Sequence, residues 1–213
     1  MSIFFQHSIN DSTSLGIWKI EEPEGFFLQR VPVNQQVTHP YKRLQHLAGR
    51  YLLPFLYADF PLEEIKIADT RKPFLHDEKY HFSISHCANF AAAIASRTSR
   101  VGVDIELVSP GIIRISGKFL NDQEKAVLQE WKDFSALHTQ LVTVLWSAKE
   151  AIYKWYGEGK VDFKNHIRLD SNKIVINANE TIRLPFIFCK HEPIKVTVEV
   201  RIFGSLVLAW LIT

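Results

Sequence analysis

Apolar side chains recur along the chain at spacings that predict both helices and strands. Over Tyr41–Leu53 the large apolar residues fall at helical spacing, so we expect a helix with one buried face there. Thr38 is placed to cap this helix, and Pro54 is expected to end or kink it. A longer helix is predicted over about Ala136–Tyr156, because its apolar residues keep the same spacing and Gly157 follows it.

Shorter apolar runs predict strands. Three follow the first long helix, and a tight His-Cys-Ala-Asn connection joins the first two; they are His81–Ser85, Phe90–Ala95 and Val101–Leu107. Four more make up the tail, namely Ile174–Ile176, Phe186–Phe188, Val196–Ile202 and Leu206–Leu211. Near the start, Ile3–Phe5 and Leu15–Ile20 are strand-like, and a helix is expected to begin at Pro23. Asn121 and Asp122 are expected to cap a helix over Glu124–Trp131.

The order of these elements repeats. In each half of the chain a long helix is followed, after a variable stretch, by two adjacent strands. We therefore predict an α+β fold of two pseudo-symmetric lobes, each a small antiparallel sheet packed with a long helix. The lobes would span residues 1–100 and 101–213, and a ligand cleft is expected at their interface.

Composition and charge narrow the class of protein. The chain has 213 residues, of which 46% are hydrophobic, a globular composition with enough apolar residues for a sizeable core. With 25 Lys+Arg against 23 Asp+Glu the formal net charge is +2, so any anion site must be local and no nucleic-acid partner is expected. The apolar runs are too short for a membrane span and no secretory leader is recognisable, so we expect no membrane partner. Cys87 and Cys189 are too few for a disulfide scaffold, which favours a cytoplasmic compartment.

Two carboxylates share one predicted strand. Asp104 and Glu106 alternate with apolar residues in Val101–Leu107, so both would point to one strand face, about 7 Å apart by the strand rise. Converging carboxylate oxygens suit a hard cation such as Mg²⁺. Taken alone, the pattern is more typical of a solvated strand face.

A second polar group lies on the long helix. Glu150 and Lys154 are four residues apart and would share a helix face, which is typical of a surface ion pair. The functional interpretation is that Glu150 completes a metal site while Lys149 or Lys154 faces phosphate. Trp146, one turn earlier, is expected in the core.

Two loops carry further polar side chains. Ser85 and His86 come at the end of a predicted strand, where they could hold an anion, although a loop histidine without that role is the more common case. Pro73 holds the preceding Lys72 extended, so both a phosphate contact and a solvated loop lysine stay open. No phosphate-binding loop or dinucleotide glycine pattern occurs, which argues against an ordinary ATP or NAD site.

Together, and in this order, the motifs resemble those of one family. They are Lys72-Pro73, Ser83-Ile84-Ser85-His86, Gly102-Val103-Asp104-Ile105-Glu106, Phe119-Leu120 with Glu124, and Trp146-Ser147-Ala148-Lys149-Glu150 with Lys154. The chain resembles the 4'-phosphopantetheinyl transferases, in particular the two-lobed, monomeric type that activates surfactin synthetase. The motifs span about residues 40–160. Arg71 stands where the family usually has a glycine before Lys-Pro.

The resemblance implies a specific reaction. Such enzymes bind coenzyme A with Mg²⁺ between their lobes, and a serine hydroxyl of an apo acyl or peptidyl carrier protein attacks the phosphate next to the pantetheine. The products are the phosphopantetheinylated carrier and adenosine 3',5'-bisphosphate. By matching positions, the implied metal ligands are Asp104, Glu106 and Glu150.

The resemblance also assigns the coenzyme A contacts. Lys154 would neutralise the diphosphate, with Lys149 nearby. The nucleotide end, including its 3'-phosphate, would be held by Lys72, Ser85 and His86. The upstream arginines that often hold coenzyme A in the family have three candidates here, Arg30, Arg43 and Arg50, of which Arg43 is included in the predicted site.

Glu150 or Glu124 would be the base for the incoming serine. Two other functions stay open. One is a module that binds coenzyme A or a carrier protein without catalysis; the other is a metal-dependent hydrolase of nucleotide diphosphates, which would use the same carboxylates. Fatty-acid, polyketide, nonribosomal-peptide and lysine-pathway carriers are all compatible with the transferase interpretation.

Overall fold

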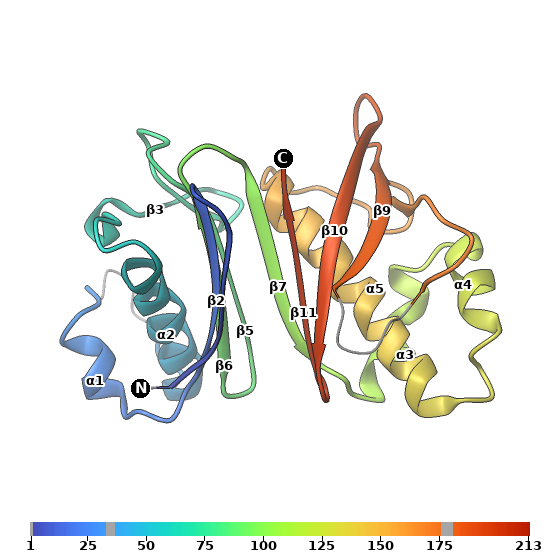
Figure 1. Cartoon of the computed structure of the whole chain (residues 1–213), viewed down its shortest axis with the longest axis horizontal. Helices are drawn as coiled ribbons and strands as arrows, with labels where there is room; N and C mark the ends of the chain where they lie inside the picture. The colour runs from blue at the N-terminus through green and yellow to red at the C-terminus, as the bar shows by residue number, and fades with distance from the viewer. Residues whose placement is uncertain (1, 33–36, 176–180) are drawn as a thin grey trace. The chain divides into compact units, whose positions relative to one another are not determined.

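The computed structural model describes residues 2–32, 37–175 and 181–213. The predicted α+β class is confirmed, because the sheets are antiparallel and the helices few (Figure 1). The chain divides into two compact units, Met1–Ile105 and Glu106–Thr213, whereas the sequence analysis placed the boundary after residue 100. Among the described residues, no helix combines the length and the apolar character that crossing a membrane requires.

The first unit contains an antiparallel sheet with one long helix packed on it. The strand order is β1-β2-β6-β5, with bounds Ile3–Asn10, Thr13–Lys19, Phe90–Ser96 and His81–Cys87. The long helix is α2 (Pro40–Leu56), and the short helix α1 (Glu24–Leu28) packs beside it. A small hairpin, β3 (Lys66–Ile67) with β4 (Pro73–Phe74), follows the short helical turn Leu62–Glu64. The β5–β6 turn is tight, and Ala88 adopts a left-handed φ of 47° in it.

Helix α2 packs on the sheet through aromatic side chains. Trp18 on β2 meets Tyr51 and Phe55 edge to face, with ring centroids 5.0 and 5.6 Å apart. The helix begins with Pro40 at its first turn, after His39, one residue later than the predicted cap Thr38. Pro54 lies inside its last turn, so the helix continues only to Leu56. A proline there costs a single backbone hydrogen bond.

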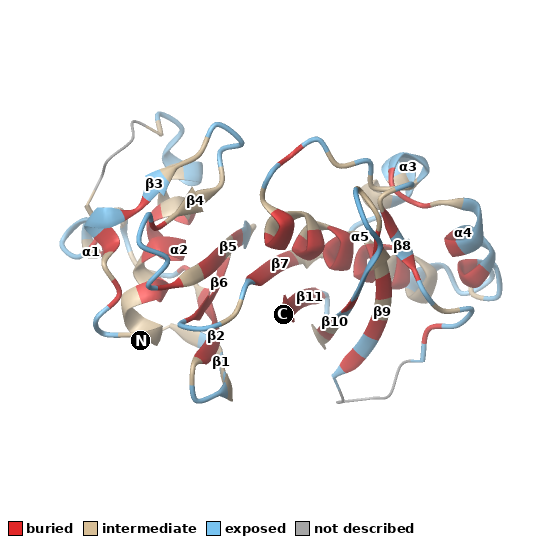
Figure 2. Ribbon diagram, turned by 90° about the horizontal axis from the view of Figure 1, so that it is seen from above, coloured by how far each residue is buried: buried red, intermediate tan, exposed pale blue. Residues whose placement is uncertain are grey.

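The second unit is built on α5 (Ser135–Tyr156), which packs against two strands of a five-stranded sheet. The strand order is β7-β11-β10-β9-β8, with bounds Val101–Leu107, Leu206–Ile212, Ile194–Phe203, Ile182–Phe188 and Ile167–Leu169. Strand β7 contains the boundary between the two units. Figure 2 shows that α5 is largely buried, and its core contacts come from the inner residues of these strands.

The helix ends of the second unit follow the predicted chemistry. The Asn121 side chain caps α4 (Asp122–Gln129) by accepting from the N–H of Glu124, and the Glu124 carboxylate accepts from the N–H of Asn121, which completes a capping box. Gly157 ends α5 with a φ of 78°, a conformation that glycine adopts without steric cost. Two shorter helical segments, α3 (Gly111–Ile115) and the turn Ser116–Lys118, precede α4.

One strand expected in the tail is not formed. Ile174 and Val175 lie outside any strand, and residue 176 falls outside the described residues. Ile174 is apolar because it packs into the core of the second unit, not because it pairs with a neighbouring strand. The other strand predictions hold, with ends that shift by a few residues.

Gly49 on α2 allows close packing of the helix on β5. A Cβ added at Gly49 would lie 2.5 Å from the Cγ2 of Ile84, well inside van der Waals contact. We therefore expect Gly49→Ala to lower the free energy of unfolding by about 1 kcal/mol or more, although alanine favours helices over glycine by a similar amount.

The matched control for Gly49→Ala is Gly25→Ala on α1, where an added Cβ has no neighbour within 4 Å. It should leave stability unchanged or raise it by up to about 1 kcal/mol. Urea unfolding of both variants measures the difference. Equal stability of the two variants would show that the contact with Ile84 does not limit the packing of α2.

Candidate active site

Asp104 on β7 is held by the Ser-Ile-Ser-His motif. Its carboxylate is 3% exposed and accepts a hydrogen bond from the Ser85 hydroxyl, with an oxygen–oxygen distance of 2.8 Å. The neighbouring Ser83 hydroxyl accepts from the N–H of Val103, at 3.2 Å. The structure thus brings together two motifs that the sequence analysis placed on separate strands, and it gives Ser85 the role of orienting a carboxylate.

Glu106, two residues further along β7, contacts Trp146 on α5. The indole Nε1 of Trp146 donates to Glu106 Oε1 at 3.4 Å. Trp146 is half-buried and packs on two other rings, with centroid distances of 4.9 Å to Phe119 and 5.6 Å to Phe163. The prediction that Trp146 belongs to the core is therefore only partly right, since one edge of its ring faces a predicted metal ligand.

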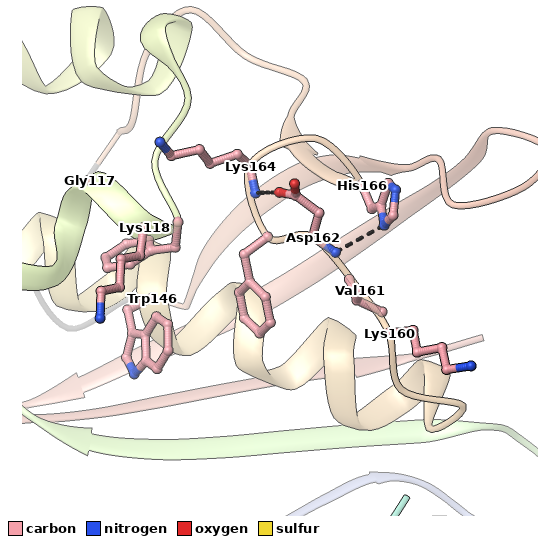
Figure 3. A pocket seen from close by; sticks show the side chains of 10 residues that line it. Gly117, Lys118, Trp146, Lys160, Val161, Asp162, Lys164 and His166 are labelled. Atoms are coloured by element: carbon pink, nitrogen blue, oxygen red, sulfur yellow. Dashed lines mark hydrogen bonds between the residues drawn. The ribbon is translucent and has the colours of Figure 1, made fainter.

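A pocket of about 770 Å³ opens beside these rings in the second unit (Figure 3). We call it the aromatic pocket. Its walls come from the residues before α4, from α5 and from the loop after α5, and its lining residues are Gly117, Lys118, Phe119, Trp146, Lys160, Val161, Asp162, Phe163, Lys164 and His166. Rings form its apolar part, while lysines contribute positive charge. Such a surface fits a ligand with an extended, largely uncharged segment next to an anionic group.

The loop after α5 is ordered by its own hydrogen bonds. The Asp162 carboxylate accepts from the backbone N–H groups of Lys164 and Asn165 and from the Asn165 side chain, at 2.8 to 3.1 Å. These bonds lower the pKa of Asp162. The His166 ring accepts from the Asp162 N–H at 3.0 Å, as Figure 3 shows. The single acidic residue of the pocket lining therefore has its oxygens engaged within the loop.

Lys149 and Glu124 form a buried ion pair at 2.7 Å, and both side chains have no solvent exposure. This arrangement bears on the predictions made for both residues. Lys149 was expected near phosphate, but its ammonium is surrounded by protein oxygens. Glu124 was expected as a possible base, but both of its oxygens accept hydrogen bonds in the interior. We assign both residues to the internal structure of the second unit.

A cluster of basic side chains lies in the first unit, where α2 meets the end of β5. Arg50 is 3% exposed, and within the described part of the chain no acidic side chain forms a salt bridge with it. Its burial lowers the pKa of the guanidinium. His46, one helical turn earlier, has its pKa lowered to about 4 by burial and by the positive charges of Arg50 and His86.

The sequence analysis named His86 and, as a candidate, Arg50, but it missed His46. The signal was available, since His46 and Arg50 are four residues apart on one helix face. A buried guanidinium without a carboxylate partner is costly, and an anionic ligand would offset that cost. These three residues, His46, Arg50 and His86, form what we call the basic cluster.

The other basic residues predicted to contact coenzyme A differ in their surroundings. Lys72 is half-buried just before β4, and its carbonyl accepts from the N–H of Ala68 across a turn. Arg71 in the same turn has a left-handed φ of 67°, a conformation that favours the glycine usually present there in the resembling family. Arg43 donates to Glu24 at 2.8 Å, so its charge already has a carboxylate partner.

The predicted metal ligands are distributed over both units. Asp104 belongs to the first unit, while Glu106 and the half-buried Glu150 on α5 belong to the second. Lys154, also half-buried, follows Glu150 by one helical turn. Over residues 2–32, 37–175 and 181–213, no group of three or more His, Cys, Asp or Glu side chains is arranged to hold a metal ion. The three-carboxylate set therefore stays a prediction.

The chain is similar to proteins that attach phosphopantetheine. A model of the 4'-phosphopantetheinyl transferase superfamily matches residues 100–209. Enterobactin synthase component D of Salmonella typhi is 33% identical over 121 residues, which cover 55% of this chain and 49% of that protein. The 4'-phosphopantetheinyl transferase gsp of Aneurinibacillus migulanus is 29% identical over 154 residues, covering 70% and 59%.

The 4'-phosphopantetheinyl transferase AcpT of Escherichia coli O157:H7 is 30% identical over 130 residues, covering 59% of this chain and 64% of that protein. The matched part of this chain thus spans about half to two thirds of the length of these curated relatives. The region matched by the family model contains both carboxylates of β7 and the whole of α5, whereas the basic cluster of the first unit lies outside it.

The basic cluster predicts a measurable titration. Since the folded-state pKa of His46 is about 4, below its ordinary value of 6.5, the unfolded chain binds an additional proton between these values. The free energy of unfolding therefore does not depend on His46 above pH 6.5. It falls as the pH drops from 6.5 towards 4, with a slope of at most about 1.4 kcal/mol per pH unit.

Arg50→Met should raise the pKa of His46, measured by NMR of its ring protons, because one positive charge is removed. Lys42→Met, an exposed change on the same helix, is the control and should leave the titration in place. An unchanged His46 pKa in Arg50→Met would contradict the proposed cluster.

Proposed function

Because the chain belongs to the 4'-phosphopantetheinyl transferase superfamily, we propose that it transfers the 4'-phosphopantetheine arm of coenzyme A to a serine hydroxyl of an apo acyl or peptidyl carrier protein. The family match over residues 100–209 is the observation that carries this proposal. It includes Asp104, Glu106, Glu150 and Lys154, the residues predicted for the reaction. In this proposal the chain acts as a cytoplasmic monomer.

The proposed reaction is a phosphoryl transfer. The serine oxygen forms a bond to the phosphorus next to the pantetheine, and the bond from that phosphorus to the leaving adenosine 3',5'-bisphosphate breaks. The serine proton goes to a carboxylate. Of the two bases predicted, Glu124 is enclosed in the interior, so we assign this role to Glu150.

The donor set suits magnesium. Asp104, Glu106 and Glu150 offer carboxylate oxygens, the ligands that Mg²⁺ prefers, and the Ser85 and Trp146 contacts orient the first two. When bound, the ion would neutralise the charge that develops on the diphosphate. In this proposal Lys154 adds positive charge at the same phosphates, since it lies one helical turn from Glu150.

In the first unit, the basic cluster is proposed to hold the nucleotide end of coenzyme A. The 3'-phosphate carries up to two negative charges, which would supply the partner that Arg50 lacks among the described residues. His86 would donate to the same group, and Lys72 would contact a phosphate from its turn. Arg43 is left out of this set, since it is already paired with Glu24.

In the second unit, the aromatic pocket is proposed to take the pantetheine arm. The arm is an uncharged chain of amides and methylene groups, which suits the rings of Phe119, Trp146 and Phe163. Trp146 also contacts Glu106, so the reacting phosphate at the end of the arm would lie near a predicted metal ligand.

Transfer can be tested directly by intact mass. With coenzyme A, Mg²⁺ and a panel of apo carriers, we expect at least one carrier to gain one arm, about 340 Da, as the phosphoryl transfer requires. Glu150→Ala should reduce the rate at least about 100-fold while the protein stays folded, since it removes a metal ligand and the base. Glu130→Gln, an exposed change on the C-terminal side of α4, is the control and should transfer normally. Absence of any mass gain across the panel contradicts the proposal.

The nucleotide contact has its own test, which compares coenzyme A with its analogue lacking the 3'-phosphate. For the wild type, kcat/KM should be higher with coenzyme A. Arg50→Met should reduce kcat/KM with coenzyme A about 10- to 100-fold, the value of one charge-assisted hydrogen bond, and should change it little with the analogue. Lys42→Met should keep the preference. An equal loss with both substrates would mean that Arg50 acts elsewhere.

A further inference from the structure

We propose that Lys149 is a positioning residue that sets the separation of two walls of the aromatic pocket. The inference rests on the proposed function, because it assigns that pocket to the pantetheine arm. In this view a single buried ammonium joins the segment before α4 to the loop after α5. The width of the pocket, and with it the affinity for coenzyme A, would depend on this one side chain.

The observation behind it is the number of oxygens around the ammonium. The Nζ atom of Lys149 lies 2.8 Å from the carbonyl oxygens of Phe119, Phe163 and Ile167, and 2.7 Å from Glu124 Oε2. An ammonium has three protons, so four acceptors more than satisfy it. With no solvent exposure, the group depends entirely on these oxygens.

Two of the carbonyls belong to the pocket lining. Phe119 and Phe163 both line the aromatic pocket, and the rings of both pack on Trp146. The backbone of each is therefore tied to the same nitrogen, while the side chain of each contacts the same indole. A change at Lys149 would release both segments together, although Lys149 itself is not part of the pocket wall.

Glu124 extends the same network to α4 and to the sheet. Its Oε2 also accepts from the N–H of Asn121 at 2.9 Å, and its Oε1 accepts from the N–H of Leu169 on β8 at 3.0 Å. Burial lowers the pKa of Lys149, and the Glu124 carboxylate opposes that effect. The Glu124 carboxylate therefore favours the charged form of Lys149, and the charged ammonium donates to the four oxygens around it.

A purely structural ion pair would also be buried, so the test must separate local positioning from global stability. Removing one partner leaves an uncompensated charge in the interior and is strongly destabilising. The useful variant is the double change Lys149→Met with Glu124→Gln, which removes both charges and keeps an acceptor for the α4 cap. The matched control is Lys125→Met with Asp122→Asn, an exposed Lys–Asp pair on the same helix.

Two measurements are made on the full chain. Without ligand, amide hydrogen exchange should become faster in residues 116–121 and 160–168 of the double variant and stay unchanged elsewhere. In the transfer assay, KM for coenzyme A should rise about tenfold or more while kcat stays within about threefold, because the chemical groups are intact. The control pair should change neither quantity.

Two results would overturn the inference. One is faster exchange spread evenly over the second unit, which indicates general destabilisation; the other is an unchanged exchange pattern together with an unchanged KM. The exchange result does not depend on activity. If the wild type modified no carrier, the proposed function would fail. The amide exchange rates of residues 116–121 and 160–168 would still show whether Lys149 positions the pocket walls.

Discussion

An ammonium group buried without water needs oxygen acceptors around it, and the second unit is organised to provide them for Lys149. Three backbone carbonyls and the Glu124 carboxylate meet this need. The carbonyls come from the segment before α4, the loop after α5 and the start of β8, and the carboxylate comes from α4 itself. The same contacts hold the backbone of Phe119 and Phe163, whose rings pack on Trp146. Through Trp146 the network reaches Glu106, so one buried charge connects the core to the predicted reaction centre.

The buried positive charge of the first unit, on Arg50, has different surroundings from that of Lys149. Arg50 lies in the interior, where its charge acts on His46, and no acidic residue of the described chain forms a salt bridge with it. Lys149 is neutralised by Glu124 of the same chain, whereas we propose that Arg50 is neutralised by an anionic ligand. In this proposal the lysine stabilises the fold and the arginine binds an anion. From the sequence alone, the two side chains are simply basic residues of two long helices.

The sequence predicted most of the elements because their signals are local. The period of α5, the Asn121 cap and the glycine stop at Gly157 each act within a few residues. The site was predicted less completely, since contacts between distant segments decide it. Ser85 orients Asp104, and Lys149 turns inward to Phe119 and Phe163; neither fact follows from spacing. The strand expected at Ile174 was a wrong prediction because a residue of the core can be apolar without belonging to a strand.

The most direct test of the central claim is the stoichiometry of the products. With coenzyme A, Mg²⁺ and an accepted apo carrier, the amounts of adenosine 3',5'-bisphosphate and of modified carrier are measured in the same reaction. The proposed transfer predicts equal amounts, and no bisphosphate when the carrier serine is replaced by alanine. Release of bisphosphate without a carrier would indicate a hydrolase. The absence of both products with every carrier would indicate a module that binds without catalysis. Either result would contradict the account.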